Sequence, residues 1–539
     1  MRKQMFSLAA SLLVIGVLSS ACAQPAPSPT PTTTTTPKTS PASPVPKASP
    51  TPTAAPVEAP QYGGVLRVGR TAPPRGLHPS NLTIDGTYLK TAHDTLLRLD
   101  EKGELAPWLA TEWKFSPDNK SITLTLRRGV KFHDGTDFNA AAAKWNMELR
   151  KAAKVGDYEE ITSIDVIDDY TVRLNLSKFT NTFLISLWNI GGTMSSQAAY
   201  QKDGADQARW NPVGTGPFKF VRYETDVLIK YERFDGYWQK GKPYLNGYEV
   251  AIIVDATTRA ASLRKGDVHV VEVDAKDAVE LQKLGLGNLW PSPRSINFLV
   301  PDSANPDSPF ADKRVREAVE YAVDRKGLSD ALGYGLSEPI NQITVASGYG
   351  HVPDLTGRPY NPDKAKQLLA AAGYANGLKT TIYAMPNFGA SPFLTGAVSN
   401  LKAVGIDATI ETATSGRFQQ LTQGGWRNGL IGRGGLSVEP DWLRTTYAML
   451  AATAIENKSL LRPPGWQDLW DQAMAATDMA TKRERAQQIV KKASDEAMII
   501  PLWSAGPGTM YYKTVRNLEW LGTWGANRLW SPADTWLGK

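Results

Sequence analysis

The chain has 539 residues, of which 42% are hydrophobic, and a formal net charge of +7 at pH 7. The positive charge is mild and forms no basic cluster, so the composition does not indicate nucleic-acid binding. The only cysteine is Cys22, which excludes a disulfide framework or a cysteine-based metal site in the rest of the chain. This length exceeds one ordinary hydrophobic core, and two or three domains are expected.

The N-terminus has the parts of a secretory signal. A basic start precedes the apolar segment 5–18, which is shorter than the roughly 20 residues that a membrane-spanning helix needs. The small residues 19–21 before Cys22 resemble the lipobox of bacterial lipoproteins, in which the signal is removed and the cysteine is acylated. An ordinary cleavage site beside an unrelated cysteine is the alternative. The resemblance predicts a signal peptide over 1–21 and a lipid anchor at Cys22.

Residues 22–60 predict a disordered tether. The segment contains 12 prolines, and most of its other residues are Thr, Ser and Ala, so little apolar surface is available to offset the entropy of ordering. In an extended polyproline conformation it would reach roughly 120 Å. We interpret it as a spacer, with a proline-rich recognition segment as the weaker alternative.

Motifs for catalysis or metal binding are missing from the sequence. The five histidines, which are His78, His93, His133, His269 and His351, include no pair at metal-ligand spacing, and no HExxH, GxxxxGK[ST] or GxSxG is present. His133 and Asp134 could form a general-base dyad, but Asp134-Gly135 after a β-type segment favours a turn. The glycine-rich segment 214–218 contains Pro217 where a phosphate cradle needs a backbone N–H, which also favours a turn.

The rest of the chain predicts a mixed α/β protein. Alternating apolar residues predict strands at 64–68, 121–127 and 169–176. Helical periodicity predicts helices at 312–324, 361–369 and 481–497. Asn361-Pro362 is a start signal for the second of these helices, and Gly373 is its stop signal.

Several blocks along these segments resemble the family 5 solute-binding proteins of ABC importers, the peptide/nickel class. In chain order the blocks are 63–69, 73–79, 94–100, 107–110, 126–136, 211–218, 237–238 and 312–318. The resemblance covers nearly all of the globular part. His78 departs from it, because the family usually has Asp at this place.

The resemblance implies an α/β fold of the periplasmic-binding-protein-like class II (type C), in which two lobes close around a hinged cleft. Lobe I is expected from 61–92, 211–293 and 499–539. A small inserted subdomain is expected at 93–210 and lobe II at 294–498. The blocks that identify the family are expected to be mostly scaffold rather than ligand contacts.

The resemblance also implies where the ligand binds. Residues 433–442 stand where peptide binders have a loop whose Asp pairs with the ligand's α-ammonium. Leu436 takes the place of that Asp, and Glu439 or Asp441 could replace it only in another register. Because an ammonium without a partner is costly to bury, this argues against ordinary α-peptide binding.

Further candidate contacts come from segments expected near the cleft. Aromatic faces suit sugar rings and apolar peptide side chains, although each tryptophan is also a candidate core residue. Arg433 could bind a ligand carboxylate in a bidentate fork, as could Arg427. The remaining candidates are His78, Trp290, Asn297, Trp426, Trp442 and Trp503.

The predicted function is that of a binding lipoprotein, not an enzyme, which captures a small solute such as an oligopeptide without a cofactor. Its expected partners are the permease and ATPase subunits of an ABC importer and, through the lipid anchor, the outer face of the cell membrane. The protein is expected to be a monomer. An oligosaccharide or metal-chelate receptor of the same family is one alternative, and a lipid-tethered hydrolase or chaperone-like surface protein is another.

Overall fold

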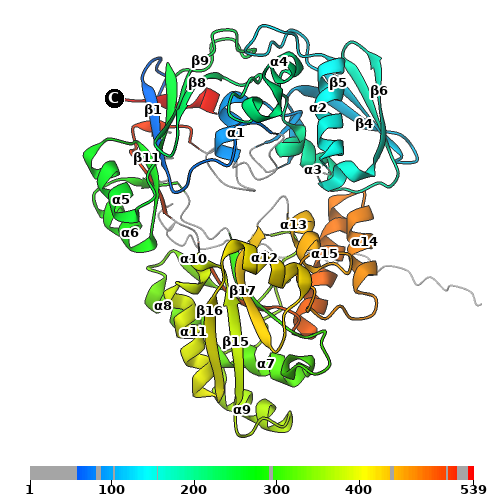
Figure 1. The fold of residues 1–539 in the computed structure, drawn as a ribbon, viewed down its shortest axis with the longest axis vertical. Helices are drawn as coiled ribbons and strands as arrows, with labels where there is room; N and C mark the ends of the chain where they lie inside the picture. The colour runs from blue at the N-terminus through cyan, green and yellow to red at the C-terminus, as the bar shows by residue number, and fades with distance from the viewer. Residues whose placement is uncertain are drawn as a thin grey trace, which may run out of the picture. The chain divides into compact units, whose positions relative to one another are not determined.

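A computed structural model of the chain describes residues 58–79, 86–100, 104–153, 156–289, 295–346, 348–437, 442–505, 508–518 and 532–539 (Figure 1). The predictions for the signal peptide, for Cys22 and for nearly all of the tether lie outside these residues. Within them, no helix combines the length and the apolar character needed to cross a membrane.

Lobe I is built on a mixed sheet of seven strands in the order β12-β19-β11-β1-β10-β9-β8. Their bounds are β1 Val65–Arg70, β8 Phe218–Glu224, β9 Leu228–Arg233, β10 Gly247–Ile252, β11 Val270–Val273, β12 Gly287–Asn288 and β19 Gly508–Tyr511. Strand β1 runs parallel to both β10 and β11, and the other pairings are antiparallel. The helices of this lobe are α1 Gly86–Ala92, α5 Ala256–Lys265 and α6 Ala275–Lys283.

The inserted subdomain has its own antiparallel sheet and hydrophobic core. The strands are β4 Ala110–Phe115, β5 Ser121–Leu126, β6 Ile161–Asp168 and β7 Thr171–Leu176, in the order β4-β5-β7-β6. The helices α2 Ala140–Ala152, α3 Phe183–Trp188 and α4 Gln197–Ala208 accompany this sheet, with a short hairpin of β2 Leu97–Leu99 and β3 Leu105–Pro107. The core is separate from those of the other parts.

Lobe II has a sheet of six strands in the order β14-β18-β13-β17-β15-β16. They are β13 Ser295–Pro301, β14 Ser337–Pro339, β15 Leu378–Ala384, β16 Ile406–Thr412, β17 Gly429–Ser437 and β18 Ile500–Ala505. The helices are α7 Lys313–Ala322, α8 Arg325–Leu332, α9 Pro362–Ala371, α10 Pro386–Gly389, α11 Pro392–Ala403, α12 Ser415–Gly424, α13 Trp442–Leu450, α14 Trp466–Ala475 and α15 Met479–Asp495. Helices α7 and α11 contribute to one hydrophobic core of this lobe, and α13, α14 and α15 pack into a second core.

One predicted domain boundary is wrong. The sequence placed everything from residue 499 in lobe I, but β18 pairs with β13 and β14 in the lobe II sheet. The chain returns to lobe I only at β19, which pairs with β11. The two connections between the lobe sheets are therefore the segment between β12 and β13 and the segment between β18 and β19.

Lobe I and the subdomain meet at a buried carboxylate, Asp94. It accepts hydrogen bonds from Trp108 Nε1 at 2.8 Å, Trp238 Nε1 at 3.0 Å, Tyr237 Oη at 3.3 Å and Thr215 Oγ1 at 3.3 Å. All five residues lie in the blocks that carry the family resemblance. Burial raises the pKa of Asp94 to about 6, and the four hydrogen bonds oppose this increase. These blocks therefore build the junction, as expected of scaffold.

The predicted turns also belong to this junction. His133 Nε2 lies 2.9 Å from the carbonyl oxygen of Gly216, while Asp134 accepts a hydrogen bond from Thr136 Oγ1 at 2.6 Å. The two side chains thus bond elsewhere and form no dyad. A Cβ atom at Gly214 would lie 2.1 Å from the carbonyl oxygen of Ala92, so only glycine permits this close approach.

Candidate functional site

Strand direction defines one edge of the lobe II sheet as the candidate ligand site. Strand β15 is parallel to β16 and β17, so the three carboxyl ends lie at the same edge. The start of β13 and the end of β18 lie there too, because Ser295 pairs with Ser437 and Asn297 pairs with Trp503. Ligands of α/β sheets bind outside the carboxyl ends of strands. Both connections to lobe I also leave from this edge.

Arg433 of β17 is the charged side chain of this edge with the clearest ligand chemistry. Its Nη1 donates to Glu456 Oε2 at 2.5 Å, and its guanidinium lies 5.8 Å from the ring centre of Phe418. The Nε atom is buried and has no hydrogen-bond partner among the described residues. The Glu456 side chain is 32% exposed, against 13% for Arg433. The pair thus keeps one free donor and one accessible carboxylate.

Asn297 and Trp503 meet at the same edge. Asn297 is half-buried and lies opposite Gly434 on one side and Trp503 on the other, with irregular register on both sides. The Trp503 ring stacks with Phe388 at 5.6 Å and with Phe393 at 4.9 Å, and only 3% of Trp503 is exposed. In this conformation its ring is therefore covered by protein and gives a ligand little surface.

Three other predicted contacts lie in the core of lobe II. Trp426 Nε1 donates to Gly429 O at 3.2 Å, and Trp442 Nε1 donates to Ile343 O at 2.8 Å. Leu436 has no exposed surface and packs in the same cluster. The pairing of β17 with β13 is irregular next to Leu436, and its side chain packs in one cluster with Trp442 of α13, so this position does not face a ligand in this conformation. The expectation for these three residues is corrected from ligand contact to core.

The structure also places His78 in a buried cluster rather than at an open surface. Its ring lies 5.1 Å from Tyr200 and 6.3 Å from His93. Burial, followed by the charge of Arg150, lowers the pKa of His78 to about 3. His78 is therefore a neutral interior residue in this conformation. Trp290, Glu439 and Asp441 lie outside the described residues.

Lobe I contributes a second charged pair at the corresponding edge of its own sheet. Arg70 is the last residue of β1, and its Nη1 lies 3.3 Å from Glu272 Oε1 of β11. Sequence reasoning missed this pair and also Glu456. The signal available for Arg70 was its position at the carboxyl end of a predicted strand, whereas Glu456 comes from a loop without a motif.

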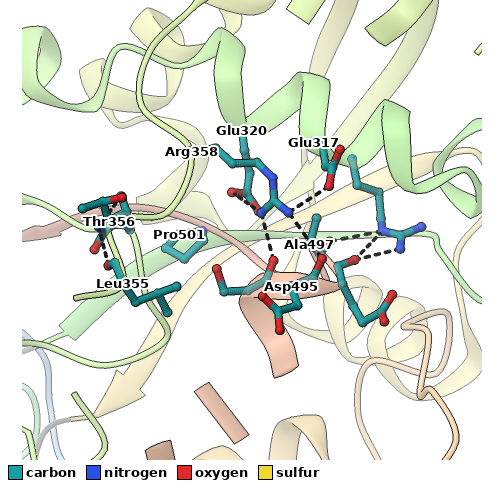
Figure 2. Close-up of polar contacts among 12 residues, drawn as sticks. Glu317, Glu320, Leu355, Thr356, Arg358, Asp495, Ala497 and Pro501 are labelled. Atoms are coloured by element: carbon teal, nitrogen blue, oxygen red, sulfur yellow. Dashed lines mark hydrogen bonds and ion pairs between the residues drawn. The ribbon is translucent and has the colours of Figure 1, made fainter. Parts of the chain in front are cut away.

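A cavity of about 260 Å³ lies elsewhere in lobe II, beside the edge strand β14. Its lining residues include Arg325, Pro339, Asn341, Arg358 and Tyr360. Figure 2 shows how Arg358 in its wall is engaged. Its guanidinium binds Glu317 at 2.9 Å, Glu320 at 3.2 Å and a main-chain carbonyl at 2.9 Å. Arg358 thus holds its loop against α7, and the cavity contains none of the predicted site residues.

The described residues include no group of three or more His, Cys, Asp and Glu side chains that could hold a metal ion. Two of the acidic groups described above are paired with arginines, Glu272 with Arg70 and Glu456 with Arg433. Within this part of the chain, a ligand that contains a metal would need to bring its own donor atoms.

Comparison with known proteins gives a consistent family. The family described as "Bacterial extracellular solute-binding proteins, family 5 Middle" matches residues 104–450. The glutathione-binding protein GsiB of Escherichia coli O1:K1 is 30% identical over 367 residues, which cover 67% of this chain and 71% of that protein.

Two solved structures share the fold. The binding protein DppA of Helicobacter pylori, in complex with the peptide STSA, has a TM-score of 0.74 at 24% identity, covering 89% of this chain and 99% of that one. NikA of Brucella suis, in complex with Fe(III)-EDTA, has a TM-score of 0.76 at 21% identity, covering 86% and 98%. The match over 104–450 and the similarity to GsiB place this chain in family 5 of the bacterial extracellular solute-binding proteins, the extracytoplasmic, non-enzymatic binding components of ABC importers.

Proposed function

We propose that the solute is a small zwitterion, such as an oligopeptide with free termini, and that Arg433 and Glu456 bind its opposite charges. The ion pair between these residues carries the proposal, because Glu456 is partly exposed and the buried Nε of Arg433 has no partner among the described residues. A guanidinium matches a ligand carboxylate, and a carboxylate matches an ammonium. Glu456 would supply the acidic group that the sequence lacks at Leu436.

The relatives support this ligand class. One is named as a glutathione-binding protein, and one was solved with a peptide. The oligosaccharide alternative is weaker, because the stacked Trp503 ring is almost fully covered. The metal-chelate alternative rests on the likeness to NikA, which extends to the fold alone.

A panel of ligands tests the proposal by thermal shift and calorimetry. It contains di- to hexapeptides with free, N-acetylated or C-amidated termini, oligosaccharides and nickel chelates. Peptides with free termini should stabilise the protein, by about 2.7 kcal/mol at a hundred times the Kd. Stabilisation by sugars or chelates, without stabilisation by any free peptide, would contradict the proposal.

Two variants assign the charges. Arg433→Gln should remove the preference for a free carboxyl terminus, and Glu456→Gln should remove the preference for a free amino terminus. Each variant should raise the Kd of the peptide with the matching free terminus by tenfold or more, because one charge is left unpaired. Arg173→Gln is the matched control, since Arg173 pairs with Asp165 at 3.3 Å on the exposed surface of the subdomain.

We further propose that the mature protein begins at Cys22, is acylated there and works as a monomer at the outer face of the cell membrane. The small residues before Cys22 and the proline-rich segment after it support a lipid anchor followed by a spacer. Cys22→Ser should move the protein from the membrane fraction to the soluble fraction. Retention of the variant on membranes would contradict the anchor.

A further inference from the structure

Asn181 of the inserted subdomain makes several hydrogen bonds to lobe II. Asn181, which precedes α3, donates from Nδ2 to the carbonyl oxygens of Ala473 at 2.7 Å and Ala476 at 3.0 Å. Its backbone N–H donates to the carbonyl oxygen of Met474 at 2.8 Å. Ala473 and Met474 belong to the last turn of α14, and Ala476 is its C-cap. One residue of the subdomain thus caps a helix of lobe II.

This contact uses groups that a helix leaves open. The last four carbonyls of an α-helix have no partner within the helix and bind water, side chains or other donors. Three donors from Asn181 satisfy three such carbonyls at once. The chain links the two lobe sheets covalently only between β12 and β13 and between β18 and β19, so the Asn181 contact is an additional, noncovalent link.

The hydrogen bonds of Asn181 to lobe II are weak enough to form and break reversibly. All its partners are uncharged, and water replaces such hydrogen bonds when they break, so each contributes little net stability. Asn181 Oδ1 is buried without a partner among the described residues, which further reduces the net gain. The neighbouring pair of Lys178 and Asp471, 3.5 Å apart and about half exposed, adds little. The contact can therefore favour the form in which the subdomain and lobe II are joined and still break readily.

We propose that Asn181 is a latch residue that favours the arrangement in which the subdomain and lobe II are joined, and that the bound solute adds to this bias. A ligand shifts a two-state equilibrium only by its differential affinity for the two states, so the latch lowers the shift that the solute must supply. Asn181 is a positioning residue in this role and does not touch the solute. The inference does not depend on the solute being a peptide.

A distance measurement without ligand tests the latch. The full mature chain carries Cys22→Ser, and spin labels are placed on Ile167→Cys in β6 and Asp407→Cys in β16, both exposed. Double electron–electron resonance between the two labels then reports the populations of the forms in which the subdomain and lobe II are joined or separated. Asn181→Ala should reduce the ratio of joined to separated forms on the order of tenfold, since two neutral hydrogen bonds are lost.

Asn181→Asp sharpens the test because it keeps the size of the side chain. Its carboxylate would face the carbonyls and the negative end of the α14 dipole, so the separated form should increase further. Asn175→Ala is the matched control. Asn175 is also half-buried, and its side-chain amide donates hydrogen bonds within the subdomain, to Ser163 and Asp165. This variant should leave the distances unchanged.

Thermal melting separates a latch from a purely structural residue. If both Asn181 variants keep the wild-type distance distribution, the proposal is overturned, whether or not the melting temperature falls. If the distribution shifts at an unchanged melting temperature, the latch is supported. Neither outcome alters the ligand-panel test of the solute class.

Discussion

Two acidic centres of this protein satisfy their charge in different ways. Asp94, at the junction of lobe I and the subdomain, is fully buried and accepts four hydrogen bonds from neutral donors. Glu456, in the loop 451–459 of lobe II, is partly exposed and has one charged partner, Arg433. The first centre is saturated by protein, whereas the second keeps binding capacity for a ligand.

The two centres also differ in their sequence context. Asp94 and its four partners come from blocks that identify the family, while Glu456 lies in a loop that no motif marks. A residue that fixes the arrangement of domains is constrained by many neighbours, but a ligand contact is constrained mainly by its solute. The sequence blocks that identify the family are therefore the least informative about the ligand.

The largest expected effect tests whether Leu436 is a core residue. Leu436→Asp would restore the carboxylate that peptide binders have, but Leu436 has no exposed surface. Burying an unpaired carboxylate and losing the packing of Leu436 should cost on the order of 5 kcal/mol, measured by chemical denaturation. Leu436→Met, which keeps the apolar volume, is the control. A stable Leu436→Asp variant with improved peptide affinity would return this position to the ligand site.

Acid should destabilise the junction around Asp94. Burial lowers the pKa of His78 to about 3 and that of His133 to about 4, and it lowers the pKa of His93 as well. A histidine with a lowered folded-state pKa holds fewer protons when folded, so stability is lost as the pH falls below its usual pKa of 6.5. Each histidine loses about 1.4 kcal/mol per pH unit in this range.

Asp94 acts in the opposite direction. Its folded-state pKa is raised from 3.8 to about 6, so the folded form binds the extra proton and gains stability as the pH falls through 6. Three histidines outweigh one acid, and the net loss between pH 7 and pH 5 should be about 4 kcal/mol. Denaturation followed across this range checks the slope. Constant stability over the range would show that the histidines are not buried as described.

Removing the saturated acid should cost less than full acidification. Asp94→Ala leaves four donors without their acceptor, at Trp108, Trp238, Tyr237 and Thr215. Loss of the burial penalty on the charge offsets part of this, and we expect about 3 kcal/mol of destabilisation. Asp118→Ala is the control, because Asp118 is exposed and makes only local bonds to Ser116 and Lys120. A cost below that of the control would mean that the junction does not depend on Asp94.

Local signals in the sequence predicted much of the scaffold. Asn361 caps α9 by accepting a hydrogen bond from Lys364 N at 2.9 Å, as its start signal indicated. Helix α7 spans Lys313–Ala322 inside the predicted 312–324, and α15 begins two residues before its predicted start. These elements are predictable because capping and periodicity act between near neighbours.

What the sequence could not predict depends on tertiary partners. The family resemblance implied that residues 499–539 belong to lobe I, and the pairing of β18 with β13 and β14 leaves no local trace in the sequence that corrects this. Trp426 and Trp442 suited a cleft as well as a core, since an indole fits both surroundings. The acid beside Arg433 lies 23 positions further along the chain. Only the fold brings such residues together.

The smallest expected effect on stability is at Glu456, and it completes the comparison with Asp94. In Glu456→Ala, Arg433 loses its ion pair but keeps its position over Phe418, and with only 13% of its side chain exposed its guanidinium is solvated in part. The cost should be about 1–2 kcal/mol by chemical denaturation, above that of an exposed ion pair and below that of a fully buried one. The same variant should lower the affinity for a zwitterionic peptide at least tenfold. A stability cost as large as that of Asp94→Ala would make Glu456 part of the scaffold, and the two acidic centres would then serve the same purpose.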